Sequence, residues 1–474
     1  MVQQPFSTSC SYPVRSSADL AFFIDGEEAF DAIASEIEKA TRYVYVTCAY
    51  ASLNFRMRPP LGEQLGDICA RASKRGVHVA LLFWQPGMLI SGTVTQAEYD
   101  EHMPAAPAVM ARWDVAKTIG VWPPRLGCHH QKTFVIDGKV AFVGGINMTQ
   151  DYWDSCDHVF DDPRRVSYDV VAGPQRDSVV KTALPLHDVF ARFTGDAVAD
   201  VEANFIERWN GASNKHGVDD IAAHKVVHAP TGPTRVQVVR TIAPGTYAGM
   251  PNGERSMKEA MLNALNGAER SVYFENQYFF DDDVVAAVRA AGMRGVRVVG
   301  LLYAHPDAGQ LVGSLEALLE EGSESLFHWT KKAPGLPGRV QLYSPATDGV
   351  VDPKDIYVHS KTMIVDDRYV LVGSANIAFT SMEFHSEMCV LVDDRAKALD
   401  LRRRLWAEHL CCAMTEVPRD FETGADRWAD AGGRNEMDRG KRPMRSRVLP
   451  LRPPKVGDDV PSILDGGSSD DSIV

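Results

Sequence analysis

No run of apolar residues in this sequence is long enough to cross a bilayer. A membrane-spanning helix needs about 20 consecutive, mainly apolar residues, and no segment of the 474-residue chain approaches that length. The N-terminal stretch MVQQPFSTSCSYPVRSS also lacks the apolar core of a secretory signal. We therefore expect a cytoplasmic protein that can meet a membrane peripherally, at its surface. Export without a cleaved signal stays open as an alternative.

Basic residues are fewer than acidic ones in this sequence. Lys and Arg number 50 against 63 Asp and Glu, which gives a formal net charge of −13. A protein that follows a nucleic-acid backbone needs an excess of cations along its binding surface. The charge balance therefore argues against a general nucleic-acid binder, although it leaves room for a small basic site.

Cysteine is present but shows no organised spacing. The eight cysteines are spread along the chain, and a chain of this length does not need a disulfide framework. We expect reduced, mostly buried thiols. The histidines, cysteines and carboxylates also lack the short spacings of a zinc site. The sequence therefore predicts no metal and no cofactor.

One short stretch occurs twice. The first copy, HHQKTFVIDGKVAFVGGIN, covers residues 129–147, and the second, VHSKTMIVDDRYVLVGSAN, covers residues 358–376. Each copy has a His, a Lys and an Asp at the same spacing, and then an apolar run that ends in Gly and Asn. These residues are His130, Lys132, Asp137, Gly144 and Asn147 in the first copy, and His359, Lys361, Asp366, Gly373 and Asn376 in the second.

Each copy predicts a β-hairpin. The segments TFVI and TMIV are apolar and β-branched, as in buried strands, and Asp137-Gly138 is a strong turn signal where Asp366-Asp367 is a weaker one. Side chains alternate along a strand, so the His and Lys of each copy share a face. Asp137 and Asp366 have the opposite parity. We expect them at the turn, away from the reacting atoms.

A His beside a Lys on a buried strand suits phosphate chemistry. The ammonium group can bind a phosphoryl oxygen as a point charge, and the imidazole can attack phosphorus or move a proton near neutral pH. With two copies, one histidine can act as nucleophile while the other protonates the leaving oxygen. A single copy would be weak evidence, but two copies with matched flanks are not.

The two copies lie in equivalent halves of an α/β chain. KRGVHVALLFW (74–84) aligns with MRGVRVVGLLY (293–303), and strand–helix segments 187–209 and 386–410 also align. Alternating helices and strands indicate a sheet covered by helices. We predict a tandem duplication of an α-β-α sandwich, with lobes at 1–212 and 236–437, a connector at 213–235 and a disordered tail at 438–474. A helix before the tail should dock through Trp428.

The second alignment places Asp188 opposite Glu387, each at the start of the strand that follows its motif. A buried carboxylate there can accept a hydrogen bond from Nδ1 of a motif histidine and leave Nε2 for phosphorus. We therefore expect Asp188 to orient His130 and Glu387 to orient His359. The alternative is that both carboxylates lie on the surface.

At the two motif copies the sequence resembles the phospholipase D superfamily, whose signature is a duplicated motif of His, Lys and Asp. GERSM (253–257) and YFENQYF (273–279) resemble segments that precede the second motif in two-motif phospholipases and cardiolipin synthases. The resemblance implies that both motifs meet in one site between two lobes related by a pseudo-twofold axis. It implies these catalytic motif residues: His130, Lys132, Asp137, His359, Lys361 and Asp366.

The resemblance also implies a two-step transfer. Phosphate is held by Lys132, Lys361, Asn147 and Asn376. His130 attacks phosphorus to form a phosphohistidine, His359 protonates the departing alcohol, and water or another alcohol then attacks. The assignment of the two histidine roles rests on the resemblance alone, because the two copies are nearly symmetric. One chain suffices for such a site, and the sequence does not define an oligomeric state.

Three substrate hypotheses follow. The first is a phospholipase D or phosphatidyltransferase acting on glycerophospholipids at a membrane surface, and the second is a cardiolipin synthase-like transferase. The third is a nuclease with the same chemistry, which the negative net charge disfavours. Aromatic residues in the long segments 86–128 and 304–357 favour the lipid hypotheses, because they could line the site: Trp113, Trp122, His328, Trp329 and Tyr343.

The sequence departs from the phospholipase pattern after the second motif. The segment NIAFTSMEFHSEM (376–388) lacks the Asn-x-Arg-Ser form and has Ala378, Phe379 and Thr380 before Ser381. Whatever pairing an arginine makes at this point in the family is therefore in doubt for this chain.

Overall fold

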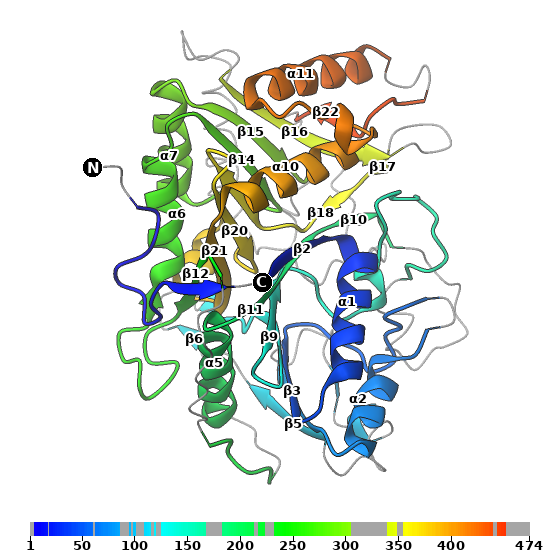
Figure 1. Ribbon diagram of the computed structural model, residues 1–474, viewed down its shortest axis with the longest axis vertical. Helices are drawn as coiled ribbons and strands as arrows, with labels where there is room; N and C mark the ends of the chain where they lie inside the picture. The colour runs from blue at the N-terminus through cyan, green and yellow to red at the C-terminus, as the bar shows by residue number, and fades with distance from the viewer. Residues whose placement is uncertain are drawn as a thin grey trace.

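Two β-sheets with the same strand order form the centre of the protein (Figure 1). The computed structural model describes residues 4–17, 19–59, 62–85, 94–95, 98–100, 109–114, 118–119, 125–166, 183–212, 217–222, 232–304, 339–347, 354–438 and 443–451. The first sheet runs, in spatial order, through β2 (Leu20–Ile24), β11 (Val189–Thr194), β9 (Val140–Gly144), β8 (Lys132–Ile136), β3 (Tyr43–Cys48), β4 (His78–Trp84) and β5 (Val109–Asp114).

The second sheet repeats that order. It runs through β1 (Arg15–Ser17), β12 (Thr234–Ile242), β21 (Glu387–Asp393), β20 (Tyr369–Gly373), β19 (Thr362–Val365), β14 (Ser271–Asn276), β15 (Arg297–Leu302), β16 (Val340–Thr347) and β17 (Lys354–Asp355). In both sheets three parallel strands continue into an antiparallel group that contains the motif hairpin. The duplicated α/β fold is therefore confirmed.

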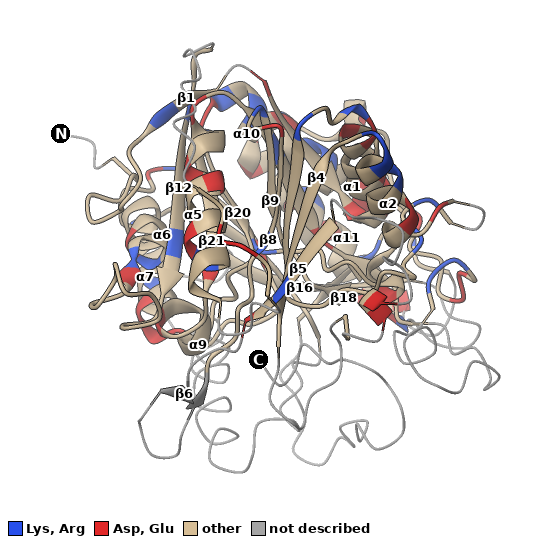
Figure 2. Ribbon diagram, turned by 90° about the horizontal axis from the view of Figure 1, so that it is seen from below, with Lys and Arg blue, Asp and Glu red and all other residues tan. Residues whose placement is uncertain are grey.

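Helices cover the outer faces of the paired sheets. Figure 2 shows α1 (Asp25–Lys39) and α2 (Leu65–Lys74) on one side of the molecule, and α6 (Ser256–Asn266) and α7 (Asp282–Met293) on the other. The other helices within the described residues are α5 (Ala197–Gly211), α9 (Phe379–Glu383), α10 (Arg395–His409) and α11 (Phe421–Asp438), with short 3-10 turns η1 (Gln150–Tyr152) and η3 (Met414–Glu416). Between these layers β9 and β11 contact β20 and β21 of the other lobe.

The chain ends depart from the expected division. The strand β1 lies at the start of the chain but pairs with β12 of the second sheet. The expected tail from 438 onward is wrong where it is described, because β22 (Val448–Pro450) pairs with β16 and buries Val448 and Leu449. The apolar pair in a mainly polar segment gives this strand its anchor. Trp428 docks α11 as expected and is fully buried.

Three further short strand pairs lie within the part of the chain that the structure describes. β10 (Leu186–His187) pairs in parallel with β18 (Tyr357–Val358) across the two lobes. β6 (Thr118–Ile119) pairs with β7 (Arg125–Leu126), and β13 (Glu254–Arg255) pairs with β12. Most of the predicted connector, 213–235, lies outside the described residues, as do residues 452–474.

The motif aspartates tie each hairpin turn to the neighbouring strand. Asp137 accepts hydrogen bonds from the backbone N–H groups of Thr41, Arg42 and Tyr43, at the start of β3. Asp366 accepts the equivalent three bonds from residues 269–271 at the start of β14. Both residues adopt a positive φ, at 54° and 55°, as the tight hairpin turn requires.

Replacing Asp137 with Asn should lower stability rather than chemistry. The change removes the charge that strengthens four hydrogen bonds, so the free energy of unfolding should fall by about 2 kcal/mol. Burial raises the pKa of this carboxyl, but the hydrogen bonds from Thr41 and from the backbone outweigh burial and lower it from 3.8. The higher free energy of unfolding of the wild type, relative to Asp137→Asn, should therefore be present at neutral pH and disappear as the pH falls below about 4.

Denaturant unfolding between pH 3 and pH 7 measures this difference. Asp67→Asn on the exposed face of α2 is the matched control and should change stability by less than about 0.5 kcal/mol. Equal stabilities of wild type and Asp137→Asn at neutral pH would show that the turn does not depend on the carboxylate.

Candidate active site

The backbone just before each motif strand is held by the opposite lobe. The N–H of His130 donates to the carbonyl oxygen of Ser386 at 3.0 Å, and the N–H of His359 donates to that of His187 at 2.9 Å. Ser386 and His187 immediately precede Glu387 and Asp188. These two equivalent backbone hydrogen bonds between the lobes bring the start of each motif alongside the carboxylate of the other lobe.

The carboxylates consequently pair with the histidines across the lobes. His130 Nδ1 lies 3.0 and 3.1 Å from the two oxygens of Glu387, and His359 Nδ1 lies 2.6 Å from Asp188 Oδ2. All four side chains are buried. The expected pairing of each histidine with the carboxylate of its own lobe is therefore wrong, because equivalent positions in a duplicated chain need not touch each other.

The two motif histidines share one site. The centroids of the His130 and His359 rings are 6.5 Å apart, with the rings inclined by 65°. In each ring the carboxylate occupies Nδ1, so Nε2 is the nitrogen that can attack or protonate a group between them. The two histidines can therefore act on opposite sides of a single phosphorus centre.

Glu387 is surrounded by hydrogen-bond donors. Ser374 Oγ and Ser381 Oγ donate to its two oxygens at 2.5 and 2.7 Å, in addition to the His130 contact. Burial raises the pKa of this carboxyl, but the charge and the hydrogen bond of His130 outweigh burial and bring the pKa below its usual range. Ser381 thus contacts Glu387 directly in the segment that lacks the family's arginine.

Asp188 occupies a tighter position. A Cβ at Gly145 would collide with both of its carboxylate oxygens, and the backbone N–H of Val189 donates to Oδ1 at 2.7 Å. Gly145 is the counterpart of Ser374 in the repeat. In one half the short side chain of Asp188 lies against Gly145, and in the other the longer side chain of Glu387 lies against Ser374. The two halves therefore place their carboxylates beside the histidines in different ways.

The two lysines contact the backbone of the motif histidines, with Lys132 as the first residue of β8 and Lys361 immediately before β19. Lys132 Nζ donates to the carbonyl oxygen of His130 at 3.0 Å, and Lys361 Nζ donates to that of His359. Lys361 Nζ also lies 3.4 Å from Gln277 Oε1. Both ammonium groups are buried beside the histidine pair, where they provide positive charge for an anionic group.

The motif asparagines each present an amide atom that is available to a ligand. Asn147 Oδ1 accepts from the N–H of Tyr50 at 3.2 Å, and its buried Nδ2 has no hydrogen-bond partner among the described residues. Asn376 Oδ1 is likewise buried without such a partner in the described structure. Since the oxygen and nitrogen of an amide are assigned from its partners, either amide can donate to a phosphate oxygen.

Asp137 and Asp366 do not join this group. Their carboxylates bind backbone N–H groups at the hairpin turns, at the far end of the motif strands from the histidines. The place of these residues among the catalytic motif residues is therefore corrected to a structural one. This agrees with their parity along the strand.

Several residues of the site were not predicted from the sequence. Tyr152 packs edge-on against the His359 ring at 4.9 Å between centroids, and the His385 ring lies 6.3 Å from that of His130. Gln277 lies in the YFENQYF segment, whose resemblance was a signal for it. Tyr152 begins the segment Tyr152-Trp153-Asp154, which resembles a segment after the first motif in bacterial phospholipases, but the sequence alone assigned it no role.

The aromatic residues that were expected to line the site do not line it where the structure describes them. Trp113 lies in β5, is buried, and donates from its ring nitrogen to the carbonyl of Val94. Tyr343 lies in β16 and packs against Trp428. Both belong to the core because β5 and β16 are separate strands within the long segments 86–128 and 304–357, where the sequence predicted loops. Trp122, His328 and Trp329 lie outside the described residues.

Comparisons with known proteins identify the family of the chain. A family profile described as phospholipase D matches residues 36–284, and a profile described as cardiolipin synthase, PLD-like domain, matches residues 261–408. Since the first covers more than half of the chain, the chain belongs to the phospholipase D superfamily.

Individual relatives point to more than one reaction. The chain is 27% identical to phospholipase D A of Dictyostelium discoideum over 84% of its own length and 36% of the relative's. It is 25% identical to cardiolipin synthase 1 of Staphylococcus aureus, strain COL, over 80% of its length and 65% of the relative's. The chain thus spans only part of these relatives.

A solved structure supports the fold. A phosphatidylserine synthase from Haemophilus influenzae Rd KW20 matches with a TM-score of 0.56 over 90% of this chain and 96% of that one, at 15% identity. Within the described part of the chain, none of the helices has the length and apolar character that crossing a membrane requires.

Removing one carboxylate should affect the histidine of the opposite lobe. Glu387→Gln should abolish the downfield NMR resonance of the His130 Nδ1 proton and leave that of His359, and Asp188→Asn should do the reverse. Each change should lower kcat by about 10²-fold or more, because the ring loses its fixed orientation and tautomer. His130→Ala assigns the resonance. Loss of the His130 signal in Asp188→Asn would contradict the crossed pairing.

Proposed function

We propose that the protein is a phospholipase D-type phosphodiesterase and phosphatidyltransferase that acts on glycerophospholipids through a phosphohistidine. The observation that carries this proposal is the buried pair of histidines, 6.5 Å apart between ring centroids, each with Nδ1 on a carboxylate. The names of the relatives, phospholipase D and cardiolipin synthase, support a phospholipid substrate.

The reaction divides into two displacements. In the first, Nε2 of one histidine attacks phosphorus, the bond to the leaving alcohol breaks, and the other histidine gives that oxygen a proton. In the second, the now neutral histidine takes a proton from water or an alcohol, which attacks phosphorus and releases the first histidine. We assign the nucleophile to His130 and the acid to His359.

The remaining site residues stabilise the charge on phosphorus oxygens. Lys132 and Lys361 place two ammonium groups beside the histidines, and the amides of Asn147 and Asn376 can donate to the same oxygens. Fixed donors of this kind favour the transition state because they need no rearrangement when the charge develops. The buried carboxylates stabilise the imidazolium that forms on the acid histidine.

A transfer reaction like that of cardiolipin synthases is the second candidate. The profile match at residues 261–408 and the Staphylococcus aureus relative favour it. The transfer reaction needs no further catalytic residues, because the second displacement accepts an alcohol as readily as water when the alcohol is bound.

Vesicle assays with and without ethanol test the lipid substrate. Phosphatidylcholine, phosphatidylglycerol and phosphatidylethanolamine vesicles should yield phosphatidic acid, and phosphatidylethanol when ethanol is present. His130→Ala should yield neither, with a loss of at least about 10⁴-fold. Formation of cardiolipin from phosphatidylglycerol would favour the second candidate. Cleavage of single-stranded DNA or RNA with no lipid product would overturn the proposal.

Trapping the intermediate tests the two histidine roles. With a phosphodiester whose leaving group needs no proton, His359→Ala should still form the phosphohistidine but release it slowly, because no base activates water. An acid-labile phosphoryl group should therefore accumulate on His130, as peptide mapping can locate. Accumulation on His359 in the His130→Ala protein would instead reverse the assignment.

A further inference from the structure

A second set of histidines and carboxylates is buried directly behind the Asp188–His359 pair. Asp25 begins α1, His158 follows η1, His187 lies in β10, and Glu408 is near the end of α10 in the second lobe. Asp25, His158 and His187 are fully buried, and the Glu408 side chain is 6% exposed. The reaction proposed above uses none of these side chains.

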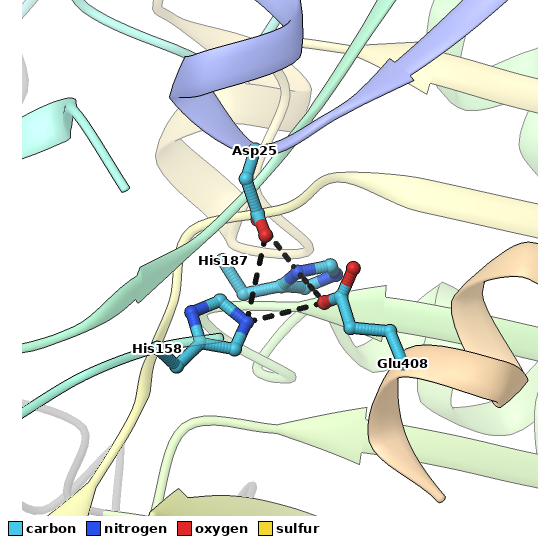
Figure 3. A group of neighbouring side chains, drawn as sticks. All are labelled: Asp25, His158, His187 and Glu408. Carbon is cyan, nitrogen blue, oxygen red and sulfur yellow. Dashed lines mark hydrogen bonds and ion pairs between the residues drawn. The ribbon is translucent and has the colours of Figure 1, made fainter. Parts of the chain in front are cut away.

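The four side chains point at one another from separate elements (Figure 3). His158 Nε2 lies 3.1 Å from Glu408 Oε1 and 3.5 Å from Asp25 Oδ2. His187 Nδ1 lies 3.0 Å from Glu408 Oε1 and 2.9 Å from Asp25 Oδ1. One ligand atom from each residue can be chosen so that all four lie within 4.8 Å of one another.

Four of these spacings are in the range of a tetrahedral metal site. Bonds of about 2.0–2.1 Å from zinc to histidine nitrogen and carboxylate oxygen place neighbouring ligand atoms about 3.3 Å apart. The four contacts above, at 2.9 to 3.5 Å, are close to that edge length, with the two histidines facing different oxygens of Asp25. With one atom taken from each residue, all distances stay within 4.8 Å. Calcium and magnesium prefer shells of oxygen ligands, whereas two imidazoles with two carboxylates suit zinc.

The outer nitrogen of each histidine also binds a carboxylate. His158 Nδ1 lies 2.9 Å from Asp154 Oδ2, and His187 Nε2 lies 3.1 Å from Glu275 Oε2. Metal-bound histidines commonly donate their second N–H to a carboxylate, which fixes the ring and its tautomer. Both histidines of this group have that arrangement, and the two outer carboxylates come from different lobes.

The backbone at two of the four residues is strained. Asp25 and His158 both adopt a positive φ, at 62° and 46°, which costs energy for a residue with a side chain. Such strain persists where the surroundings demand a particular side-chain position. Here it turns Asp25 and His158 toward His187 and Glu408.

The charges of the group suit a cation. Two carboxylates, Asp25 and Glu408, face the two imidazoles in the centre of the group. Their combined charge of −2 matches the charge of a divalent cation bound between the four side chains.

We propose that Asp25, His158, His187 and Glu408 form a structural site for a divalent metal ion, with zinc the best fit, which joins the two lobes behind the active site. Four protein ligands fill a tetrahedral shell, as in structural rather than catalytic zinc sites. The site would fix the His187 peptide, whose carbonyl oxygen accepts from the N–H groups of His359 and Ser360. This proposal does not depend on the substrate of the active site.

Metal content is the first test. The full chain, produced with zinc in the medium and dialysed, should contain one zinc per chain by elemental analysis and release it to a chromogenic chelator on unfolding. Protein produced with cobalt should show the intense visible bands of tetrahedral cobalt. Metal-free protein that keeps the same melting temperature with and without added zinc, and shows no cobalt bands, would overturn the proposal.

Two pairs of variants give matched controls. Glu408→Gln and His158→Gln should each lower the bound zinc at least about tenfold and lower the melting temperature of the zinc-loaded protein. Glu254→Gln and His129→Gln alter a buried carboxylate and a buried histidine outside the group, and they should keep the metal. Equal zinc in both pairs would place the ion elsewhere. If the ligand variants fail to fold, the cobalt spectrum of the wild type decides alone.

Discussion

The exchange of hydrogen bonds between the lobes is the constraint on which the active site depends. Each motif histidine is held twice by the opposite half, through its backbone N–H and through Nδ1 of its ring. A lobe by itself would contain a histidine without its carboxylate and a buried carboxylate without its histidine. Because unpaired buried charge is costly, the same contacts that orient the two rings also favour association of the lobes.

The sequence was sufficient to predict the motif hairpins, but it could not predict which residues of the two lobes contact each other. The β-branched runs, the Asp-Gly turn and the repeated spacing predicted the motif hairpins, and strand parity separated Asp137 from His130 and Lys132. The alignment of Asp188 with Glu387 identified two equivalent carboxylates. It could not say which histidine each one meets, because a twofold arrangement and its exchanged form have the same sequence pattern. Contacts between the lobes distinguish them, among them the pairing of β10 with β18 and the bridge from His129 to Ser386.

Long-range pairing also explains the errors at the chain ends. Nothing local in Arg15–Ser17 or Val448–Pro450 indicates a strand, since each segment is only three residues long. Each becomes a strand because an edge of the second sheet offers unpaired backbone groups. Trp113 and Tyr343 were misplaced for a related reason, because β5 and β16 are separate strands that long segments separate from β4 and β15, the strands with which they pair.

The buried group around His187 is likewise assembled by contacts between parts of the chain that are distant in the sequence. The sequence separates Asp25, His158, His187 and Glu408 too widely for a metal-ligand spacing to be recognised, and the fold brings them together. His187 contributes its ring to this group and its backbone carbonyl to His359, and the next residue is Asp188. Any change in how the ring is held, by protons or by a metal ion, therefore reaches the active site through a single peptide unit. The geometry of His359 thus depends on how charge is balanced in a cluster outside the group of motif residues.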